Sequence, residues 1–383
     1  TLYICYFGLR EPLVQTQVLP YLRELSVRGV EVHLLTFEPD KNSSWSPEIE
    51  FDVRESLEKQ GIRWACLPYH KRPSMPATAY DVLAGARKIR ELSERFSIDI
   101  LHARSHVPMA MALLARRRHQ QVIFDIRGLL ADEYADAGVW KKGSAPYKLM
   151  KILEDRGVRE AASVVVLTER MRDWLVMRKG VPRDKVKVIP CCVDLSRYDS
   201  GSEVCDGFEI IYAGSVTGLY LLEEMGRFFV EVSRRYSEAR LRLLTKTPRQ
   251  NVLEKLSRLG IEDKKVEVTY VEPQRVPLYL RRARVGLSFR KPTFSQIAAS
   301  PTKIAEYLAS GLPVVSNAGI GDVDALLERE RVGVLVKDFH AEAYAQAADK
   351  LVDLLHDPEL AERCRRAARR YFDLKSVGGE RYF

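Results

Sequence analysis

The chain carries one stretch that decides its fold class, SQIAASPTKIAEYLASGLPVVSN at residues 295–317. It predicts a loop, a helix, a turn and a strand, in that order. Ser300 can cap the helix, and Pro301 suits its first turn. Gly311 ends the helix, and Pro313 opens a short apolar strand. The stretch therefore predicts one helix–strand unit of an α/β sheet.

The start of this predicted helix has the chemistry of an anion site. Ser300, Pro301 and Thr302 bring unpaired backbone N–H groups and the positive end of the helix dipole, and Lys303 stands beside them. One turn later, Glu306 lies on or near the same face. Its carboxylate can accept hydrogen bonds from a ribose diol. A phosphate cradle beside a ribose carboxylate suits a nucleotide sugar, whereas a plain surface helix is the alternative.

Short apolar segments alternate with longer helical patterns along the rest of the chain. The pattern predicts, for example, a strand at 2–7, a helix at 15–28 and a mostly helical segment at 351–374. Such alternation indicates parallel sheets that are covered on both faces. We therefore expect an α/β protein with two Rossmann-like, doubly wound domains that face each other across a cleft.

The predicted domains follow from where the pattern stops and restarts. We expect an N-terminal domain at 1–195, on the side of the group that accepts a sugar, and a second domain at 208–365, which would bind the nucleotide sugar as the donor. Residues 196–207 are polar and are interpreted as a linker. A C-terminal tail at 366–383 is expected to dock back on the N-terminal domain.

Composition narrows the class of protein. The chain has 383 residues, 46% of them hydrophobic and 30% charged, which is typical of globular proteins. The net charge of +9 is spread out and lacks the basic stripe with aromatics of a nucleic-acid binder. The six cysteines have no metal-like spacing, so we expect no metal and interpret them as buried free thiols.

The sequence also bears on location. No apolar run approaches the ~20 residues of a membrane span. The chain starts in an apolar strand without a basic leader, so a cytoplasmic location is expected. Basic clusters at 116–118 and 141–142 can attract anionic headgroups at the inner membrane face, and solvated helix faces are the alternative.

In the second domain, three further segments follow predicted strands. All three are expected at the edge of the sheet where those strands end. The turn at 210–220, IIYAGSVTGLY, offers Gly214, Ser215, Gly218 and Tyr220 as one wall of a donor pocket. The cations that could neutralise a pyrophosphate are Arg290 and, as a second candidate, Lys246. The loop after the strand at 313–316 contributes Gly319 and Gly321, whose backbone N–H groups could face the ligand.

In the first predicted domain, polar residues likewise follow the ends of strands. The loop GLREPLVQTQV at 8–18 carries Gln15 and Gln17. One strand ends in LHARSH at 101–106 and the next in FDIRG at 124–128, followed by Asp132 and Glu133. A buried Arg–Asp structural pair is an equal alternative to a functional one here.

These motifs resemble those of the retaining family-four glycosyltransferases, in a subgroup with EPLxQSQV-like and SPTKxxEY motifs. The resemblance runs from Tyr3 to about Val336 and implies the GT-B fold. Two departures stand out: Val14 replaces a common glycine, and Ala298 replaces the first of two glutamates found in many members. The resemblance points to His102, Asp125, Arg127, Lys303 and Glu306 as catalytic residues, and to Gln15, Gln17 and Arg104 on the acceptor side. His70, which follows a predicted strand, is a further acceptor-side candidate, and a satisfied polar residue without a role in binding is the alternative.

The resemblance implies a metal-independent, hexosyltransferase-like enzyme without a cofactor. A nucleotide-diphosphate sugar, UDP- or GDP-linked, would be the donor substrate. A glycan or lipid-linked acceptor would receive the sugar with retention of anomeric configuration, in glycan or surface polysaccharide biosynthesis. A nucleotide-sugar 2-epimerase of the same fold and a catalytically silent nucleotide-sugar-binding partner subunit remain alternatives.

Overall fold

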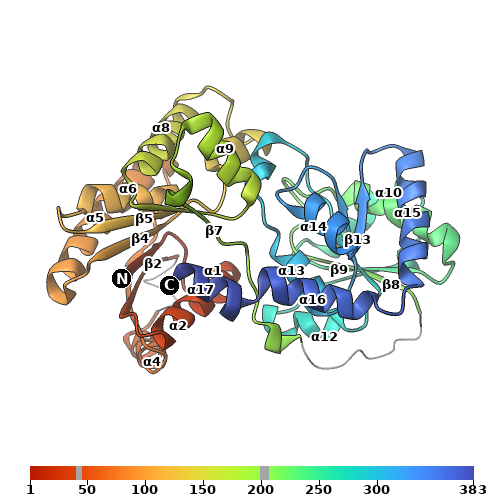
Figure 1. The fold of residues 1–383 in the computed structure, drawn as a ribbon, viewed down its shortest axis with the longest axis horizontal. Coiled ribbons are helices and arrows are strands. Elements are labelled where there is room, and N and C mark those ends of the chain that lie inside the picture. The colour runs from red at the N-terminus through yellow and green to blue at the C-terminus, as the bar shows by residue number, and fades with distance from the viewer. Residues whose placement is uncertain (40–44, 199–206) are drawn as a thin grey trace. The chain divides into compact units, whose positions relative to one another are not determined.

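The computed structural model describes residues 1–39, 45–198 and 207–383. The chain forms two compact units (Figure 1). Unit 1 holds Thr1–Ile189 and Gly378–Phe383, and unit 2 holds Pro190–Val377. Most of the predicted linker, 199–206 with Cys205, lies outside the described residues. Each unit is built around one parallel sheet, so the predicted α/β class with two Rossmann-like sheets is confirmed.

The sheet of unit 1 has seven parallel strands in the order β3-β2-β1-β4-β5-β6-β7. The order reverses between β1 and β4, which is the topological switch point of a doubly wound sheet. The strands are β1 (Leu2–Cys5), β2 (Val32–Glu38), β3 (Ile62–Pro68), β4 (Ile100–Arg104), β5 (Gln121–Asp125), β6 (Ser163–Val166) and β7 (Val186–Val188).

Helices connect these strands in sequence. The prediction of one helix at 15–28 is wrong, because the backbone breaks at Val18 (φ −123°, ψ −65°), two residues before Pro20. Proline has no N–H to continue a helix. The helices are α1 (Pro12–Gln17), α2 (Leu19–Val27), α4 (Pro47–Glu58), α5 (Ser74–Phe96), α6 (His106–Ala115), α7 (Leu130–Asp136), α8 (Ala145–Glu160), α9 (Glu169–Lys179) and, at the C-terminus, α17 (Glu380–Tyr382).

The sheet of unit 2 has six parallel strands in the order β10-β9-β8-β11-β12-β13. Its switch point lies between β8 and β11. The strands are β8 (Glu209–Ala213), β9 (Arg240–Leu244), β10 (Val266–Thr269), β11 (Val285–Ser288), β12 (Val314–Asn317) and β13 (Gly333–Val336).

The helices of unit 2 cover both faces of its sheet. The predicted single segment at 351–374 is two helices, which are separated by residues 356–359 with Pro358 among them. The helices are α10 (Leu222–Arg235), α11 (Arg249–Ser257), α12 (Val276–Leu280), α13 (Thr302–Ala309), α14 (Val323–Glu330), α15 (Ala341–Leu355) and α16 (Leu360–Phe372). None of the helices that the structure describes is long and apolar enough to cross a membrane.

The side chains of β8 show how the sheet of unit 2 is buried. Ile210 and Tyr212 pack into one apolar cluster with residues of α10, α11 and α15. Ile211, which points to the other face, packs with residues of α13 and α16. The alternation follows from the two-residue period of a strand. The five described cysteines, Cys5, Cys66, Cys191, Cys192 and Cys364, are free and buried, as predicted.

The chain enters and leaves unit 2 through two segments that lie side by side. Val193 N donates to Phe372 O at 2.9 Å, and Leu374 N donates to Val193 O at 3.0 Å. Val193 and Asp373 therefore form a parallel bridge. After this bridge the last six residues return to unit 1, where Arg381 Nη1 donates to Val188 O at 2.9 Å.

Candidate functional site

The carboxyl edge of the unit 2 sheet carries most of the predicted donor residues. Gly214 follows β8, Arg290 follows β11, Gly319 follows β12, and Lys246 follows β9. These four strands are neighbours around the switch point between β8 and β11. In parallel α/β sheets, ligands bind outside the carboxyl ends of the strands at this point. The sequence thus brings these residues to the edge where a ligand is expected.

The turn after β8 needs its glycines. Gly214 has φ 132° and Gly218 has φ 71°, both in the region that side-chain-bearing residues rarely adopt. A Cβ atom at Gly214 would also lie 3.1 Å from Lys303 Nζ. Ser215 closes the turn, since its Oγ accepts from Thr217 N at 3.3 Å. The turn therefore leaves room for the lysine and for close approach of a ligand.

Lys303 is a buried cation held by aromatic faces. The residue is 8% exposed. Its Nζ lies 3.9 Å from the ring centroid of Tyr212 and 4.6 Å from that of Tyr220. Within the described ranges it has no ion pair or hydrogen bond to a carboxylate. Burial, and then the positive charge of Arg290, hold the pKa of Lys303 well below its usual value, although the charge of Glu306 opposes them.

Arg290 lies on the other side of Tyr220. Its guanidinium carbon is 4.8 Å from the Tyr220 ring centroid, and its Nη1 donates to the Tyr220 hydroxyl at 3.3 Å. Gln296 Oε1 accepts from Arg290 Nε at 2.6 Å. Asn317 Oδ1 accepts from the Arg290 backbone N–H at 2.7 Å. Two cations therefore flank one tyrosine at the switch point.

Sequence reasoning missed Gln296 and Asn317, which orient Arg290. Both are polar residues that are fully or almost fully buried, Gln296 at 0% and Asn317 at 1% exposure. Both stand inside the stretch at 295–317 that the sequence singled out. An amide at the end of a buried strand is a signal that could have found Asn317, because a buried polar group needs a partner.

Glu306 lies one turn along α13 from Lys303. Tyr198 donates its hydroxyl to Glu306 Oε1 at 3.3 Å. Burial raises the pKa of the Glu306 carboxyl, and the hydrogen bond from Tyr198 opposes this change. On the same helix the Tyr307 hydroxyl accepts from Ala213 N at 3.0 Å, which ties α13 to the end of β8. Tyr198 and Tyr307 were not among the predicted site residues.

The start of α13 differs from the prediction. The N-cap residue is Pro301, the helix begins at Thr302, and no side chain caps it. The prediction that Ser300 is the cap is therefore wrong. Ser300 Oγ instead accepts from Cys191 N at 3.2 Å. The serine thus fixes the loop before the helix to the segment that enters unit 2.

The remaining donor-side candidates are placed as follows. Gly319 and Gly321 have φ 90° and 46°. Gly319 N donates to the Asp324 carboxylate at 2.9 and 3.1 Å, and Gly321 N donates to Gln296 O at 2.8 Å. Both amides are thus bonded within unit 2. Lys246 is exposed, with its Nζ 5.1 Å from the Tyr270 ring centroid.

In unit 1, Asp125 is the centre of a buried polar cluster. It is 0% exposed. Its Oδ2 lies 3.0 Å from the Tyr382 hydroxyl, 3.6 Å from Arg104 Nη1 and 3.8 Å from His102 Nε2. Its Oδ1 lies 3.7 Å from Arg127 Nη1. Burial raises the pKa of Asp125, but Arg127, His102 and Arg104 together outweigh burial and lower the pKa below its usual value.

His102 and Arg104 are buried in this cluster, at 2% and 4% exposure. Burial lowers the pKa of the His102 imidazole, and Asp125 opposes the effect. Arg104 Nη1 also lies 3.3 Å from the Tyr3 hydroxyl. Arg127 has φ 55°, an uncommon backbone conformation for a residue with a side chain. The structure thus brings His102, Arg104, Asp125 and Arg127 together, with one buried carboxylate facing two buried arginines.

The other acceptor-side candidates lie apart from this cluster in their contacts. Gln15 Nε2 donates to Leu9 O at 2.7 Å, and Gln17 is buried. His70 Nδ1 lies 2.6 Å from Asp81 Oδ1. The side chain of Asp81 is 1% exposed, whereas that of His70 is 44% exposed.

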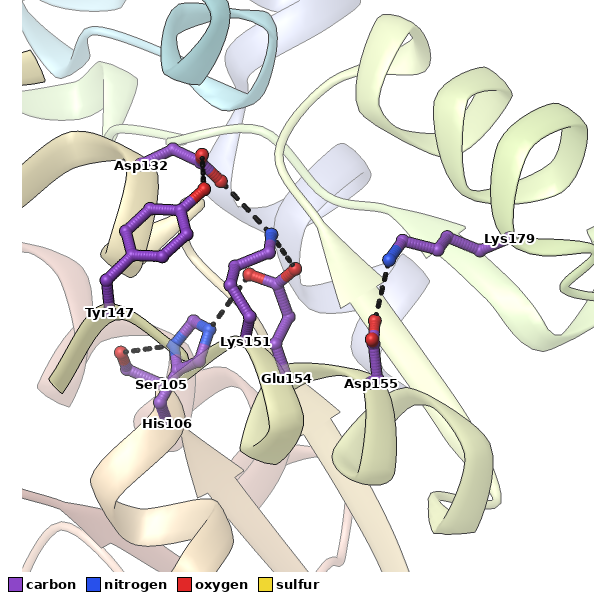
Figure 2. Close-up of polar contacts among 8 residues, drawn as sticks. All are labelled: Ser105, His106, Asp132, Tyr147, Lys151, Glu154, Asp155 and Lys179. Carbon is purple, nitrogen blue, oxygen red and sulfur yellow. Dashed lines mark hydrogen bonds and ion pairs between the residues drawn. The ribbon is translucent and has the colours of Figure 1, made fainter. Parts of the chain in front are cut away.

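A second polar cluster of unit 1 joins α6, α7 and α8 (Figure 2). Lys151 Nζ lies 3.0 Å from Asp132 Oδ2 and also binds Glu154. Tyr147 donates to Asp132 Oδ1 at 2.8 Å, and His106 Nε2 lies 3.3 Å from Glu154 Oε2. Lys151 and His106 each contact a carboxylate here, so the cluster braces the segments that follow β4 and β5.

A pocket of about 340 Å³ lies between α8 and α9 in unit 1. It contains none of the predicted site residues. Its walls include Lys179 and Asp155, which pair at 2.8 Å (Figure 2), and residues 180–182, which precede β7. The pocket is therefore at the edge opposite the carboxyl ends of the strands. Across the described ranges, no three His, Cys, Asp or Glu side chains are arranged to hold a metal ion.

Known proteins resemble both units. A glycosyl transferase 4-like domain matches residues 14–192, and the glycosyl transferases group 1 domain matches residues 208–354. Alpha-D-kanosaminyltransferase of Streptomyces kanamyceticus is 23% identical over 227 residues, which are 56% of this chain and 56% of that protein. The match thus spans little more than half the length of that relative.

Solved structures share the fold over the whole chain. Sucrose-phosphate synthase from Thermosynechococcus elongatus has a TM-score of 0.72 at 16% identity, covering 100% of this chain and 98% of that chain. Anabaena HepE in complex with UDP and glucose has a TM-score of 0.66 at 14% identity, covering 99% and 97%. These likenesses show the fold, and the two domain matches agree with it. The chain therefore belongs to the group 1 glycosyltransferases and has the GT-B fold.

Proposed function

We propose that this protein transfers a sugar from a nucleotide-diphosphate sugar to an acceptor hydroxyl, with retention of anomeric configuration. The observation that carries the proposal is Lys303, a buried lysine at the switch point of unit 2 with no carboxylate partner among the described residues. Burying a charge without a partner costs free energy. An anionic ligand would supply the missing partner, and a diphosphate has the charge to do so.

The neighbours of Lys303 support a donor site with two parts. Arg290, which shares Tyr220 with Lys303, would bind the diphosphate from its other side. Glu306, held by Tyr198, would accept hydrogen bonds from the ribose hydroxyls. The turn at Gly214 and Gly218 would allow close approach of the ligand. We also assign Ser215, Pro301 and Thr302 to the surroundings of the donor, whereas we expect the exposed Lys246 to contribute little.

The proposed chemistry stabilises the leaving group. The bond between the anomeric carbon and the diphosphate oxygen breaks, and Lys303 and Arg290 stabilise the charge that develops on the diphosphate. The acceptor oxygen bonds to the same face of the sugar. Its proton passes to an oxygen of the leaving diphosphate, and in this proposal Lys303 and Arg290 have the charge-stabilising role that a metal ion could otherwise have. Unit 1 would contribute acceptor-side residues, with His102 and Asp125 as a sugar-binding pair.

The first test is binding of nucleotides. Thermal shift against UDP, GDP, ADP, CDP, TDP and their sugars is expected to select one nucleotide family, with UDP and GDP the first candidates. Lys303→Met should abolish the shift. Stabilisation by none of these ligands would contradict the proposed donor.

Transfer must then be separated from two rival activities. The selected donor is incubated with candidate acceptors, such as glycans and lipid-linked sugars, and the sugar and nucleotide products are measured. Acceptor-dependent release of nucleotide with a retained anomer is the expected result. Release of nucleotide together with an epimerised sugar, without an acceptor, would instead establish a 2-epimerase. Binding without turnover would establish a catalytically silent partner subunit.

We further propose cytoplasmic action with peripheral contact at the inner membrane face. Lys141 and Lys142 are exposed next to Val139, which is 62% exposed. Cations beside an apolar side chain suit an anionic lipid surface. Flotation with vesicles that contain phosphatidylglycerol is expected to carry the protein, and vesicles of phosphatidylcholine alone are expected not to.

A further inference from the structure

The last residues of the chain reach the polar cluster of unit 1. Residues 378–383 belong to unit 1 although 188 residues of unit 2 separate them from the rest of it. Tyr382 lies in α17, and its ring packs against the ring of Tyr21 on α2, with centroids 5.3 Å apart. Arg381 anchors the same turn to β7 through Val188 O. The position of Tyr382 is therefore fixed from two sides.

The hydroxyl of Tyr382 makes the shorter of two tyrosine contacts with Asp125. It donates to Asp125 Oδ2 at 3.0 Å, whereas the Tyr3 hydroxyl lies 3.4 Å from the same oxygen. Burial raises the pKa of the Tyr382 phenol well above its usual value, so the hydroxyl keeps its proton and can donate. The carboxylate of Asp125 is thus oriented by a residue 257 positions away in the sequence.

The ring of Tyr382 also contacts His102. The two ring centroids are 5.3 Å apart, and the ring of Tyr3 lies 4.4 Å from His102 on β4. His102 Nε2 makes no hydrogen bond within the described residues, and Asp125 Oδ2 is 3.8 Å away. The imidazole is therefore held by two tyrosine rings, while the nearby carboxylate is held by a tyrosine hydroxyl.

We propose that Tyr382 is a positioning residue, which sets the distance between Asp125 and His102 from the C-terminus of the chain. This inference rests on the proposed function, in which His102 and Asp125 bind the sugar. Tyr382 acts through these two side chains and is not itself assigned a contact with substrate. A carboxylate that is held away from the imidazole leaves the buried Nε2 without a hydrogen bond among the described residues, and a ligand hydroxyl that enters the site could supply one.

Removing the hydroxyl is expected to release the carboxylate. In Tyr382→Phe, Asp125 Oδ2 loses the nearer of its two tyrosine donors, keeps Tyr3 at 3.4 Å, and can move the short distance to His102 Nε2. The groups that face His102 are Asp125, Tyr3, Arg104 and Arg127 besides Tyr382. A direct Asp125–His102 hydrogen bond favours the imidazolium, so the pKa of His102 should rise in the variant.

The experiment compares three tyrosine-to-phenylalanine variants of the full chain. Tyr382→Phe removes the 3.0 Å contact, and Tyr3→Phe removes the 3.4 Å contact to the same oxygen. Tyr371→Phe is the matched control, because its hydroxyl binds a carboxylate of unit 2, Glu330, at 2.6 Å. Thermal unfolding establishes that each variant is folded. The measurements are kcat and KM against pH, and the NMR titration of His102, assigned with His102→Gln.

Positioning predicts a specific pattern. Tyr382→Phe should lower kcat by about tenfold or more, because small displacements of reacting groups are costly, while KM for the nucleotide sugar stays within about twofold. The His102 titration and the acid limb of the pH profile should both move to higher pH. Tyr3→Phe should show a smaller change of the same sign, and Tyr371→Phe none.

Two results would overturn the inference. One is an unchanged His102 titration in folded Tyr382→Phe, and the other is an unchanged kcat and pH profile while the wild type transfers sugar. If the wild type transfers nothing from any donor, the proposed function fails. The His102 titration still decides the positioning role in that case, because it needs no substrate.

Discussion

Both units have buried charged residues near the carboxyl ends of their strands, but these residues have different partners. In unit 1, Asp125 lies among Arg104, Arg127, His102 and two tyrosine hydroxyls, all of them from the same unit. In unit 2, Lys303 lies among tyrosine rings and near a second cation, Arg290. The Asp125 carboxylate thus has cationic partners in its own unit, and these contacts support the fold. A charge that its unit leaves uncompensated favours a ligand.

The largest expected effect is on stability and concerns Asp125, whose charge has partners within unit 1. Asp125→Ala should lower the free energy of unfolding of unit 1 by about 3–5 kcal/mol, because Arg104 and Arg127 keep buried charges without a carboxylate. Because the pKa of Asp125 is lowered in the folded state, its contribution is fully present above the ordinary aspartate pKa of about 3.9 and is lost as the pH falls from there through the lowered pKa. Urea denaturation at pH 7 and in acid measures both.

Asp155→Ala is the control for this variant. Asp155 pairs with Lys179 at 2.8 Å, but its side chain is 53% exposed. The expected loss is at most about 1 kcal/mol. Equal losses for the two aspartates would remove the contrast between a buried cluster and a surface pair.

The next largest effect is on activity and concerns Lys303, which has no carboxylate partner among the described residues. Lys303→Met should lower kcat/KM by about 100-fold or more, as expected when a group that stabilises a developing anion is removed. The same change should raise the free energy of unfolding of unit 2 by about 1 kcal/mol, because an unpaired buried charge is replaced by an apolar side chain. Steady-state kinetics and urea denaturation measure the two effects. A variant that loses both activity and stability would show that Lys303 is structural.

A smaller effect is expected at the proposed ribose contact. Glu306→Gln should weaken donor binding by about tenfold, because hydrogen bonds to a charged acceptor are the stronger ones. In the wild type the pKa of Glu306 is raised, so donor affinity should fall as the pH drops through that raised value. Calorimetry with the nucleotide between pH 5 and pH 8 measures this. An equal pH dependence in Glu306→Gln would assign the effect to another group.

The smallest effect distinguishes exposed from buried cations at one sheet edge. Lys246 also follows a strand of unit 2, but it is exposed and has the Tyr270 ring as its neighbour. Lys246→Ala should change kcat/KM by less than about twofold. A loss comparable with that of Lys303→Met would place Lys246 in the donor site. It would also show that burial does not distinguish the cations that bind the donor from those that do not.

Local sequence signals predicted those parts of the fold that depend on neighbours in the chain. The alternation of strands and helices predicted both sheets, and Gly311, which has φ 79°, does follow the end of α13. Local patterns failed where two signals compete. Ser300 is a good cap by type, but its hydroxyl binds Cys191 instead, 109 residues away. Val18 continues an apolar pattern, and Pro20 nevertheless breaks the helix.

The residues of the candidate site divide in the same way. Some stand in short motifs, and others are identified only by contacts with distant parts of the sequence. Lys303, Glu306 and Gly214 could be singled out because they stand in short motifs at strand and helix ends. Tyr198 and Tyr382 could not, since their contacts with Glu306 and Asp125 span 108 and 257 residues. The sequence also left open whether Asp125 and Arg127 form a structural pair. The five partners around Asp125 favour the structural role and leave the sugar contact as a proposal.

The bridge between Val193 and Asp373 has a consequence for how such a chain can change over evolutionary time. Unit 2 is one continuous excursion that leaves unit 1 and returns to it at neighbouring points, so it has the topology of an inserted domain. Two crossovers near residues 190 and 377 would replace it whole, while both chain ends and the tyrosine at the C-terminus stay where they are. A chain organised in this way can acquire a new donor preference by recombination without rebuilding the half that we assign to the acceptor.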